Sequence, residues 1–203
     1  MSLDRAAGAS AAGFILLSVA VAAGIPERFD LWALHAVQSA GTGVLDWLGW
    51  FFSVLGSIEV TGALLAGVLA ALWLRNRRTL AVRGLAAFAV VSLVGIVCKL
   101  LLPYMQLPED AARVPASSGL LSLPFPYPYP SGHMARAVLV LGLIAALGGG
   151  RTMRLAVALL LAGMALTRVY LGVHWATDVA GGLLLGLAGL LWALSGRGGK
   201  TWR

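Results

Sequence analysis

The chain has 203 residues, of which 60% are hydrophobic and 11% charged, and its mean hydropathy is +0.89. A soluble domain of this size would leave much of that apolar surface in water, so the composition excludes an ordinary soluble protein and indicates an integral membrane protein. The length leaves little room for a second domain, and we expect residues 1–203 to form one membrane domain. The single cysteine, Cys98, excludes an intrachain disulfide and a CxxC redox or metal motif.

Six apolar runs predict an all-α bundle of six transmembrane helices, because about 20 helical residues cross the hydrocarbon core. The predicted spans are residues 6–24, 58–74, 84–102, 131–147, 155–170 and 176–194. The first run has a signal peptide as its alternative, since residues 20–22 (Ala-Val-Ala) form a passable cleavage site. We expect it to be retained as a span. Gly182 and Gly186, four apart in the last span, favour close packing inside the bundle, with a dimer seam as the alternative.

Two segments separate the first two spans. A short amphipathic helix is predicted from Asp30 to Gln38, lying at the membrane interface. His35 on this helix is expected to be a water-exposed surface histidine. The segment that follows is rich in tryptophan and phenylalanine, which gather at membrane interfaces. We expect Gly56 and Ser57 to break it from the second span.

The positive charges indicate which face is cytoplasmic. With six spans, ten of the fifteen basic residues fall on the face that carries both termini. They are Arg5, Arg75, Arg77, Arg78, Arg83, Arg151, Arg154, Arg197, Lys200 and Arg203. The positive-inside rule makes that face cytoplasmic. This topology explains most of the net charge of +7, so we expect no nucleic-acid partner. Arginine supplies nearly all of the basic residues, which indicates a GC-rich bacterial genome. We therefore expect a bacterial plasma membrane.

The same topology places a set of polar residues on the outer face. The chain crosses the membrane twice between His133 and Arg168, and not at all between Lys99 and His133. The set consists of Lys99, Arg113, His133, Arg136, Arg168, His174 and Asp178. Charged side chains near membrane depth are costly, which makes such a cluster a candidate functional site. The alternative is a set of snorkelling side chains and salt bridges.

The spacing of two of these residues suggests nucleophilic catalysis. His174 and Asp178 are four apart at the start of a predicted helix, so they share a face. A carboxylate that accepts from one imidazole nitrogen makes the other more basic, which suits His174 to act as a nucleophile. His133, at the start of another helix, could serve as the general acid. Nearby cations and helix-end N–H groups would stabilise a transferring phosphoryl group.

A zinc site is the alternative, since two histidines and one aspartate are possible zinc ligands. The neighbouring cations disfavour a divalent metal ion, so we expect neither a metal nor another cofactor.

Two motifs resemble those of the type 2 phosphatidic acid phosphatase superfamily. Its PSGH motif stands intact at residues 130–133, where a proline ladder ends and Ser131 is expected to cap a helix. Its S-R-x5-H-x3-D motif reads Thr167-Arg168, His174 and Asp178, with threonine in place of serine. The six-span plan also matches.

The family's first motif, K-x6-R-P, is incomplete. Lys99 fits the lysine, but Gln106 stands where the arginine belongs, and Pro108 follows one residue late. Arg113, farther along the loop, is one candidate for the missing arginine. Arg136, one turn after His133 on the same helix face, is the other. The alternative for Arg136 is an ion pair with Glu59 or Asp178 inside the bundle.

The resemblance implies a lipid phosphatase acting at the outer face through a phosphohistidine. His174 would attack phosphorus, Asp178 would orient it and His133 would protonate the leaving oxygen. The phosphate would be held, without metal, by Lys99, Arg113, Ser131, Gly132 and Arg168.

Candidate substrates are isoprenyl diphosphates, phosphatidylglycerol phosphate and phosphatidic acid. The alternatives are a lipid-phosphate phosphotransferase and a non-catalytic transporter of lipids or anions. The sequence leaves the oligomeric state open.

Overall fold

The computed structural model of the chain describes residues 2–113 and 125–196. Every regular element in these residues is helical, which confirms the all-α prediction. The α-helices are α1 (Leu3–Ala22), α2 (Glu27–Gln38), α3 (Gly43–Leu55), α4 (Ile58–Leu74), α5 (Arg78–Leu101), α6 (Gly132–Gly148), α7 (Arg151–Tyr170) and α8 (Ala176–Ser195), and a single 3₁₀ turn, η1 (Glu109–Ala111), lies between α5 and α6.

Helix length and composition support a membrane protein. The helices α1, α5, α7 and α8 are each long and apolar enough to cross a bilayer. The pair α3 and α4 is bent by 51° and passes the same test when taken as one broken span. The apolar helix α6 has 17 residues, at the short end of the range for a membrane span. Four or five spans are therefore supported among the described residues, and the sixth remains a prediction.

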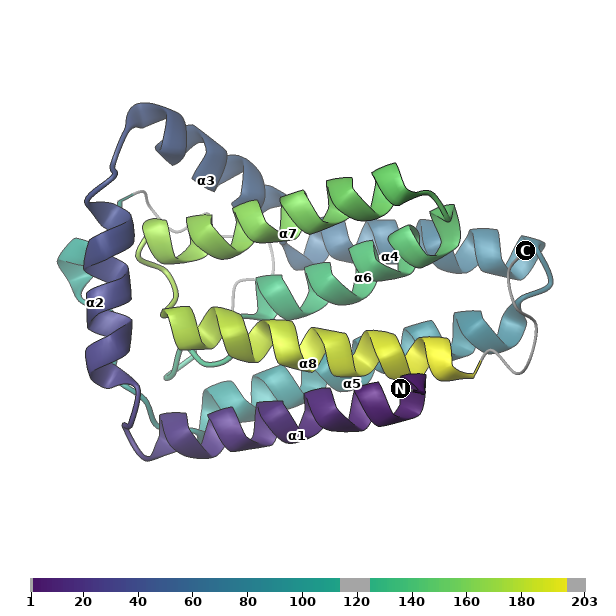
Figure 1. Cartoon of the computed structure of the whole chain (residues 1–203), viewed down its shortest axis with the longest axis horizontal. Helices are drawn as coiled ribbons and strands as arrows, with labels where there is room; N and C mark the ends of the chain where they lie inside the picture. Colours follow the sequence, from purple (N-terminus) through teal and green to yellow (C-terminus); the bar gives the residue numbers. More distant parts are fainter. Residues whose placement is uncertain (1, 114–124, 197–203) are drawn as a thin grey trace.

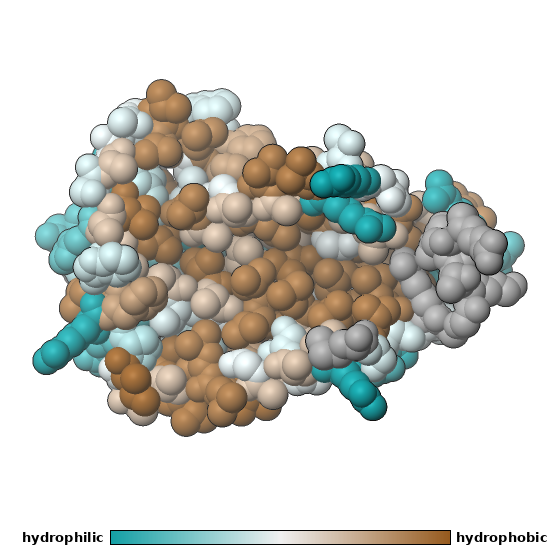
Figure 2. Space-filling model, viewed as in Figure 1, coloured by the Kyte–Doolittle hydropathy of each residue, from teal (hydrophilic) through white to brown (hydrophobic). Residues whose placement is uncertain are grey.

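The long helices run side by side, whereas α2 lies across one end of the bundle (Figure 1). The visible face in Figure 2 is apolar over the middle of the bundle, and hydrophilic side chains gather toward its two ends. That distribution fits a bilayer-spanning body. The helix α8 packs against α1, α5 and α6, so the segment that carries Asp178 is supported from three sides.

The two ends of the bundle carry different parts of the chain (Figure 1). One end holds the first turn of α1, the last turn of α8 and the α4–α5 and α6–α7 turns. The other holds α2 and the α7–α8 turn, which contains His174, and α6 begins inside the bundle with its start directed toward this end. This is the relative arrangement that the topology predicts. Which end is cytoplasmic remains a prediction from the charges.

The predicted break between the interfacial segment and the second span is confirmed. Ser57 caps α4, since its side chain accepts a hydrogen bond from Val60 N, 3.2 Å away. Gly56 ends α3, and a Cβ added there would come within 2.9 Å of His133 Cδ2. A glycine at the bend therefore lets this backbone lie directly against the candidate acid.

Two helices begin earlier than the apolar runs predicted. The helix α5 starts at Arg78 rather than at residue 84, and α7 starts at Arg151 rather than at residue 155. Hydropathy detects only the part of a helix that enters hydrocarbon, while the helix itself continues into the polar interface. Basic residues expected in turns thus occupy the first helical turns.

Candidate active site

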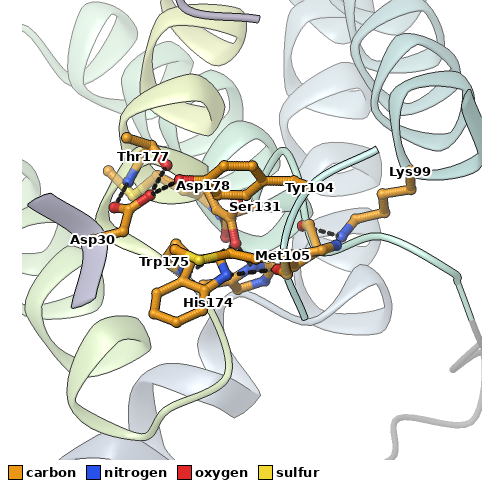
Figure 3. A network of polar contacts seen from close by, with 11 residues as sticks. Asp30, Lys99, Tyr104, Met105, Ser131, His174, Trp175, Thr177 and Asp178 are labelled. Carbon is orange, nitrogen blue, oxygen red and sulfur yellow. Dashed lines mark hydrogen bonds and ion pairs between the residues drawn. The ribbon is translucent and has the colours of Figure 1, made fainter. Parts of the chain in front are cut away.

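The α7–α8 turn and the first turn of α8 hold a buried histidine–aspartate pair (Figure 3). His174 Nδ1 lies 3.1 Å from Asp178 Oδ2. The same carboxylate oxygen accepts a hydrogen bond from Trp175 N at 2.9 Å, as in a capping box. His174 is 7% exposed and Asp178 is fully buried. The cap thus holds Asp178 in place, and Asp178 leaves Nε2 as the ring nitrogen available for chemistry.

The PSGH motif is tied to this pair through the backbone. Ser131 N donates to Asp178 O at 2.9 Å, so the starts of α6 and α8 meet. Ser131 is fully buried and caps α6 as predicted, with its Oγ accepting from Met134 N. Helix α8 approaches this closely because Gly182 has no side chain: a Cβ there would lie 2.4 Å from Ser131 O. This supports a packing role for Gly182 within the bundle.

Three cations converge on this end of α6. Arg168 Nη1 donates to Ser53 Oγ at 2.6 Å, and Lys99 Nζ donates to Pro128 O at 2.6 Å. Arg136 Nη2 lies 3.4 Å from Gly56 O. The Nε atoms of both arginines are buried and have no hydrogen-bond partner among the described residues. The cations therefore retain hydrogen-bonding capacity that an anion could satisfy.

Electrostatics place His174 within this cluster. Burial, followed by the positive charges of Lys99 and Arg168, holds the pKa of His174 well below its usual value of 6.5. His133 and Arg136 act in the same direction. The imidazole is therefore neutral at physiological pH, which is the form that can act as a nucleophile.

His133 belongs to the same group of charges. Its imidazole is close enough to feel the positive charges of Arg168, Arg136 and Lys99. Its side chain packs on the bend at Gly56, as the close Cβ approach there shows. The structure thus brings together seven of the eight residues predicted for the site, namely His133, His174, Asp178, Lys99, Ser131, Gly132 and Arg168.

The eighth predicted residue, Arg113, lies in a different set of contacts. Its Nε donates to Asp46 Oδ1 at 3.1 Å, in a pair whose side chains are each 32% exposed. Its guanidinium also stacks on Tyr170, 4.8 Å from the ring centroid. The charges that act on His174 include Arg136, the rival candidate from the sequence, and do not include Arg113.

A second buried network beside the pair was missed from the sequence (Figure 3). Asp30 of α2 is fully buried. Its Oδ1 accepts from Thr177 N at 3.0 Å, and its Oδ2 accepts from Thr177 Oγ1 at 2.5 Å and Tyr104 OH at 2.6 Å. The signal was present, because Asp30 lies on the same helical face as the apolar residues Ala33 and Leu34, where a charge needs partners.

Residues of metal-ligating type do not cluster further in the part of the chain that the structure describes. No group of three or more histidine, cysteine, aspartate or glutamate side chains there could hold a metal ion. The chemistry available from the described residues is that of a nucleophilic imidazole, a second imidazole and several cations, at the ends of membrane-embedded helices. Such a set suits the transfer of an anionic phosphoryl group.

Comparison with known proteins places this site in a family. The sequence profile of the PAP2 superfamily matches residues 85–202, more than half of the chain. The chain therefore belongs to the PAP2 superfamily, which confirms the resemblance seen in the two motifs. No relative among curated protein sequences matches this chain.

Two solved structures share the fold. One is the transmembrane PAP2-type phosphatidylglycerolphosphate phosphatase from Bacillus subtilis, 22% identical, with a TM-score of 0.73 over 93% of this chain and 94% of that one. The other is LpxE from Aquifex aeolicus, 22% identical, with a TM-score of 0.62 over 81% of this chain and 93% of that one. At these identities the likeness concerns the fold.

Proposed function

We propose that this protein is a membrane lipid phosphatase that works through a phosphohistidine on His174. The observation that carries the proposal is the His174–Asp178 contact of 3.1 Å, which leaves Nε2 available beside three cations. Membership of the PAP2 superfamily supports the same reaction class.

The proposed reaction has two displacements at phosphorus. In the first, His174 Nε2 forms a bond to phosphorus while the bond to the lipid oxygen breaks. His133 enters this step as the imidazolium, which the negative charge of the bound phosphate favours, and gives its proton to that oxygen. In the second, His133 takes a proton from water as the water oxygen bonds to phosphorus and the P–N bond breaks. The products are the dephosphorylated lipid and inorganic phosphate, and both side chains return to their starting states.

We assign the phosphate oxygens to Lys99, Arg168, the start of α6 at Ser131 and Gly132, and Arg136. Arg136 takes the place of the arginine missing from the first motif, because it acts on both histidines. Arg113 would have to leave Asp46 and Tyr170 to serve there. A Cβ added at Gly132 would lie 2.9 Å from Arg136 Nη1, so the guanidinium already borders the motif backbone.

Asp30 is assigned a positioning role. Its carboxylate holds both the backbone N–H and the hydroxyl of Thr177, which immediately precedes Asp178. It also holds the Tyr104 hydroxyl, and burial together with this hydrogen bond raises the pKa of Tyr104. Three segments are thereby fixed around the turn that carries His174, so Asp30 acts on catalysis through the placement of that imidazole.

The substrate class follows from the membrane setting. A phosphorylated lipid of the outer leaflet can reach a site at the end of the bundle that is predicted to face outward. Phosphatidylglycerol phosphate is the first candidate, since one structural neighbour is a phosphatase of that lipid. Isoprenyl diphosphates and phosphatidic acid follow. Transfer to another lipid or a sugar, in place of water, would use the same residues.

Replacement of the nucleophile tests the proposal. Purified His174→Ala protein should lose phosphate release from lipid phosphates by at least about 10³-fold, because the covalent step is removed. His35→Ala is the matched control: His35 is exposed on α2, and its loss should change the rate by less than about twofold. Parental activity in the His174→Ala protein would refute the assignment of His174 as the nucleophile. No phosphate release by the parental protein would favour the non-catalytic transporter.

Activity in excess chelator tests the metal-free part of the mechanism separately. Retention of full activity is expected, and loss of activity that zinc restores would contradict that part. Product analysis with water or an added lipid alcohol as acceptor then distinguishes a hydrolase from a transferase.

A further inference from the structure

A groove runs between α4 and α6 at the end of the bundle away from His174. Its volume is about 730 Å³. Leu64, Gly67, Val68 and Ala71 line it from α4, and the last turn of α6 lines it with Leu147. Their spacing of three and four residues places them on one face of α4, so the groove follows the helix.

One end of this apolar groove is basic. Arg75 and Arg77, in the turn that follows α4, complete its lining. An apolar channel with cations at one end is complementary to an amphipathic anion, and its volume lies within the range of small-molecule sites. Basic pockets between transmembrane helices at the cytoplasmic face are suited to anionic lipid head groups. The positive-inside rule predicts that this end is cytoplasmic.

We infer that this groove binds one anionic glycerophospholipid of the inner leaflet, with an acyl chain along α4 and its phosphate at Arg75 and Arg77. The positive charge at the mouth of the groove favours an anionic lipid as its occupant over a second copy of this chain. The copy would carry a net charge of +7 and bring further arginines to a basic mouth. The site lies apart from the proposed catalytic residues and does not depend on the proposed function.

The chain provides a matched pair of variants for the apolar part. A Cβ added at Gly67 meets nothing within 4 Å, and Gly67 lines the groove, so Gly67→Phe places a ring in the groove from an unobstructed Cβ. A Cβ added at Gly62, which lies on α4 outside the groove lining, likewise meets nothing within 4 Å. Gly62→Phe therefore controls for a phenylalanine added to this helix.

A second pair tests the basic end. Arg75→Gln removes a cation from the groove mouth. Arg78→Gln removes one from the start of α5, where the guanidinium stacks on Trp73, 5.1 Å from the ring centroid, outside the groove lining. Each change lowers the charge of the α4–α5 connection by one, so a difference between the two variants depends on where the charge lies.

Native mass spectrometry of the purified protein, titrated with phosphatidylglycerol or with phosphatidylcholine of the same acyl chains, measures the binding. The parental protein should hold one phosphatidylglycerol more tightly than phosphatidylcholine. Arg75→Gln should weaken that lipid by about fivefold, as expected for one cation near the head group, and Gly67→Phe should abolish the preference. The controls Arg78→Gln and Gly62→Phe should stay within about twofold of the parental protein.

Equal binding of the two lipids by the parental protein, or equal effects of each variant and its control, would overturn the inference and indicate ordinary annular lipid. A parental dimer that Gly67→Phe converts to monomer, seen in the same spectra, would assign the groove to subunit contact instead.

Discussion

The two ends of the bundle use arginine in opposite ways. At the basic end, Arg83 lies against the C-terminal turn of α8, where it donates to Trp192 O and to Ser195 Oγ at 2.9 Å and stacks 4.3 Å from the Trp192 ring centroid. A cation at a helix C-terminus is stabilised by the carbonyl groups that end the helix. Arg83 thus supports the fold, although its Nε, like those of Arg136 and Arg168, is buried without a hydrogen-bond partner among the described residues.

At the other end, cations are gathered where they repel one another. Arg168 and Arg136 interact unfavourably, and both act on the two histidines together with Lys99. The nearby carboxylate of Asp178 is engaged with His174 and Trp175. Like charges brought together away from water destabilise the empty protein, and a bound phosphate offsets that cost. Glu59 offsets part of the charge of Arg136, and Asp178 offsets part of that of Lys99. The two ends thus differ in that cations at one of them repel each other around two histidines, whereas Arg83 at the other supports a helix end.

Among the changes that bear on this comparison, the largest effect is expected to separate the two candidate arginines. Arg136→Gln should lower kcat/KM for a lipid phosphate by about 10²-fold, because a cation that contacts the transferring phosphoryl group is lost. Arg113→Gln should change it by less than about threefold, because an exposed ion pair with Asp46 contributes little. Steady-state kinetics of the two purified variants make the comparison. A larger loss in Arg113→Gln than in Arg136→Gln would return Arg113 to the site.

A smaller effect is expected at Asp30. Asp30→Ala should lower kcat by about 10- to 100-fold and change KM by less than about threefold, since His174 would be misplaced while the phosphate-binding groups remain. Asp46→Ala, an acid on α3 paired with Arg113, is the matched control and should retain kcat within about threefold.

The folded fraction of each variant, measured by size-exclusion chromatography and thermal unfolding, is used to correct kcat. Asp30→Asn keeps an acceptor oxygen, so its kcat should lie between that of the parental protein and that of Asp30→Ala. If Asp30→Ala fails to fold, Thr177→Val and Tyr104→Phe should each lower kcat in the same way. Unchanged kcat per folded molecule in these variants would assign Asp30 to stability alone.

The smallest effect concerns pH. The lowered pKa of His174 keeps the imidazole neutral as pH falls through 6.5, so the acidic limb of kcat/KM should lie below that value. The charged groups facing His174 are Lys99, Arg168, His133, Arg136 and Asp178. The pKa of the lipid phosphate is measured separately by phosphorus NMR, and the pH profile of kcat/KM is corrected for the ionisation of the substrate. An enzyme limb centred at or above 6.5 would contradict the neutral imidazole.

Local features of the sequence predicted two parts of the site, the capped start of α6 and the contact between His174 and Asp178. The end of the proline ladder and the serine at residue 131 predicted a capped helix, and α6 begins at Gly132 with Ser131 as its cap. The four-residue spacing predicted the His174–Asp178 pair, which lies at 3.1 Å. The shared helix face was wrong, because His174 precedes Trp175, the N-cap of α8, and the pair forms at the capping box instead. Both features depend on residues close together in the chain, where helix capping determines which residues meet.

Contacts between distant segments were not predictable in the same way. Asp30 meets Thr177 across 147 positions, and only the packing of α2 over the start of α8 brings them together. The choice between Arg113 and Arg136 likewise depended on a partner, Asp46, that no spacing rule connects to the loop. The sixth span stays a prediction, because α6 has only 17 residues and lies at the short end of the range for a membrane span.

The covalent intermediate is the central claim, and rapid-quench labelling tests it most directly. Parental protein mixed with a lipid phosphate carrying ³²P in its terminal phosphate, then quenched in alkali within milliseconds, should carry label that is stable to base, labile to acid and located by peptide mapping on His174. The His174→Ala protein should carry none. Label on another residue, or rapid release of phosphate with no labelled protein at any quench time, would contradict the account.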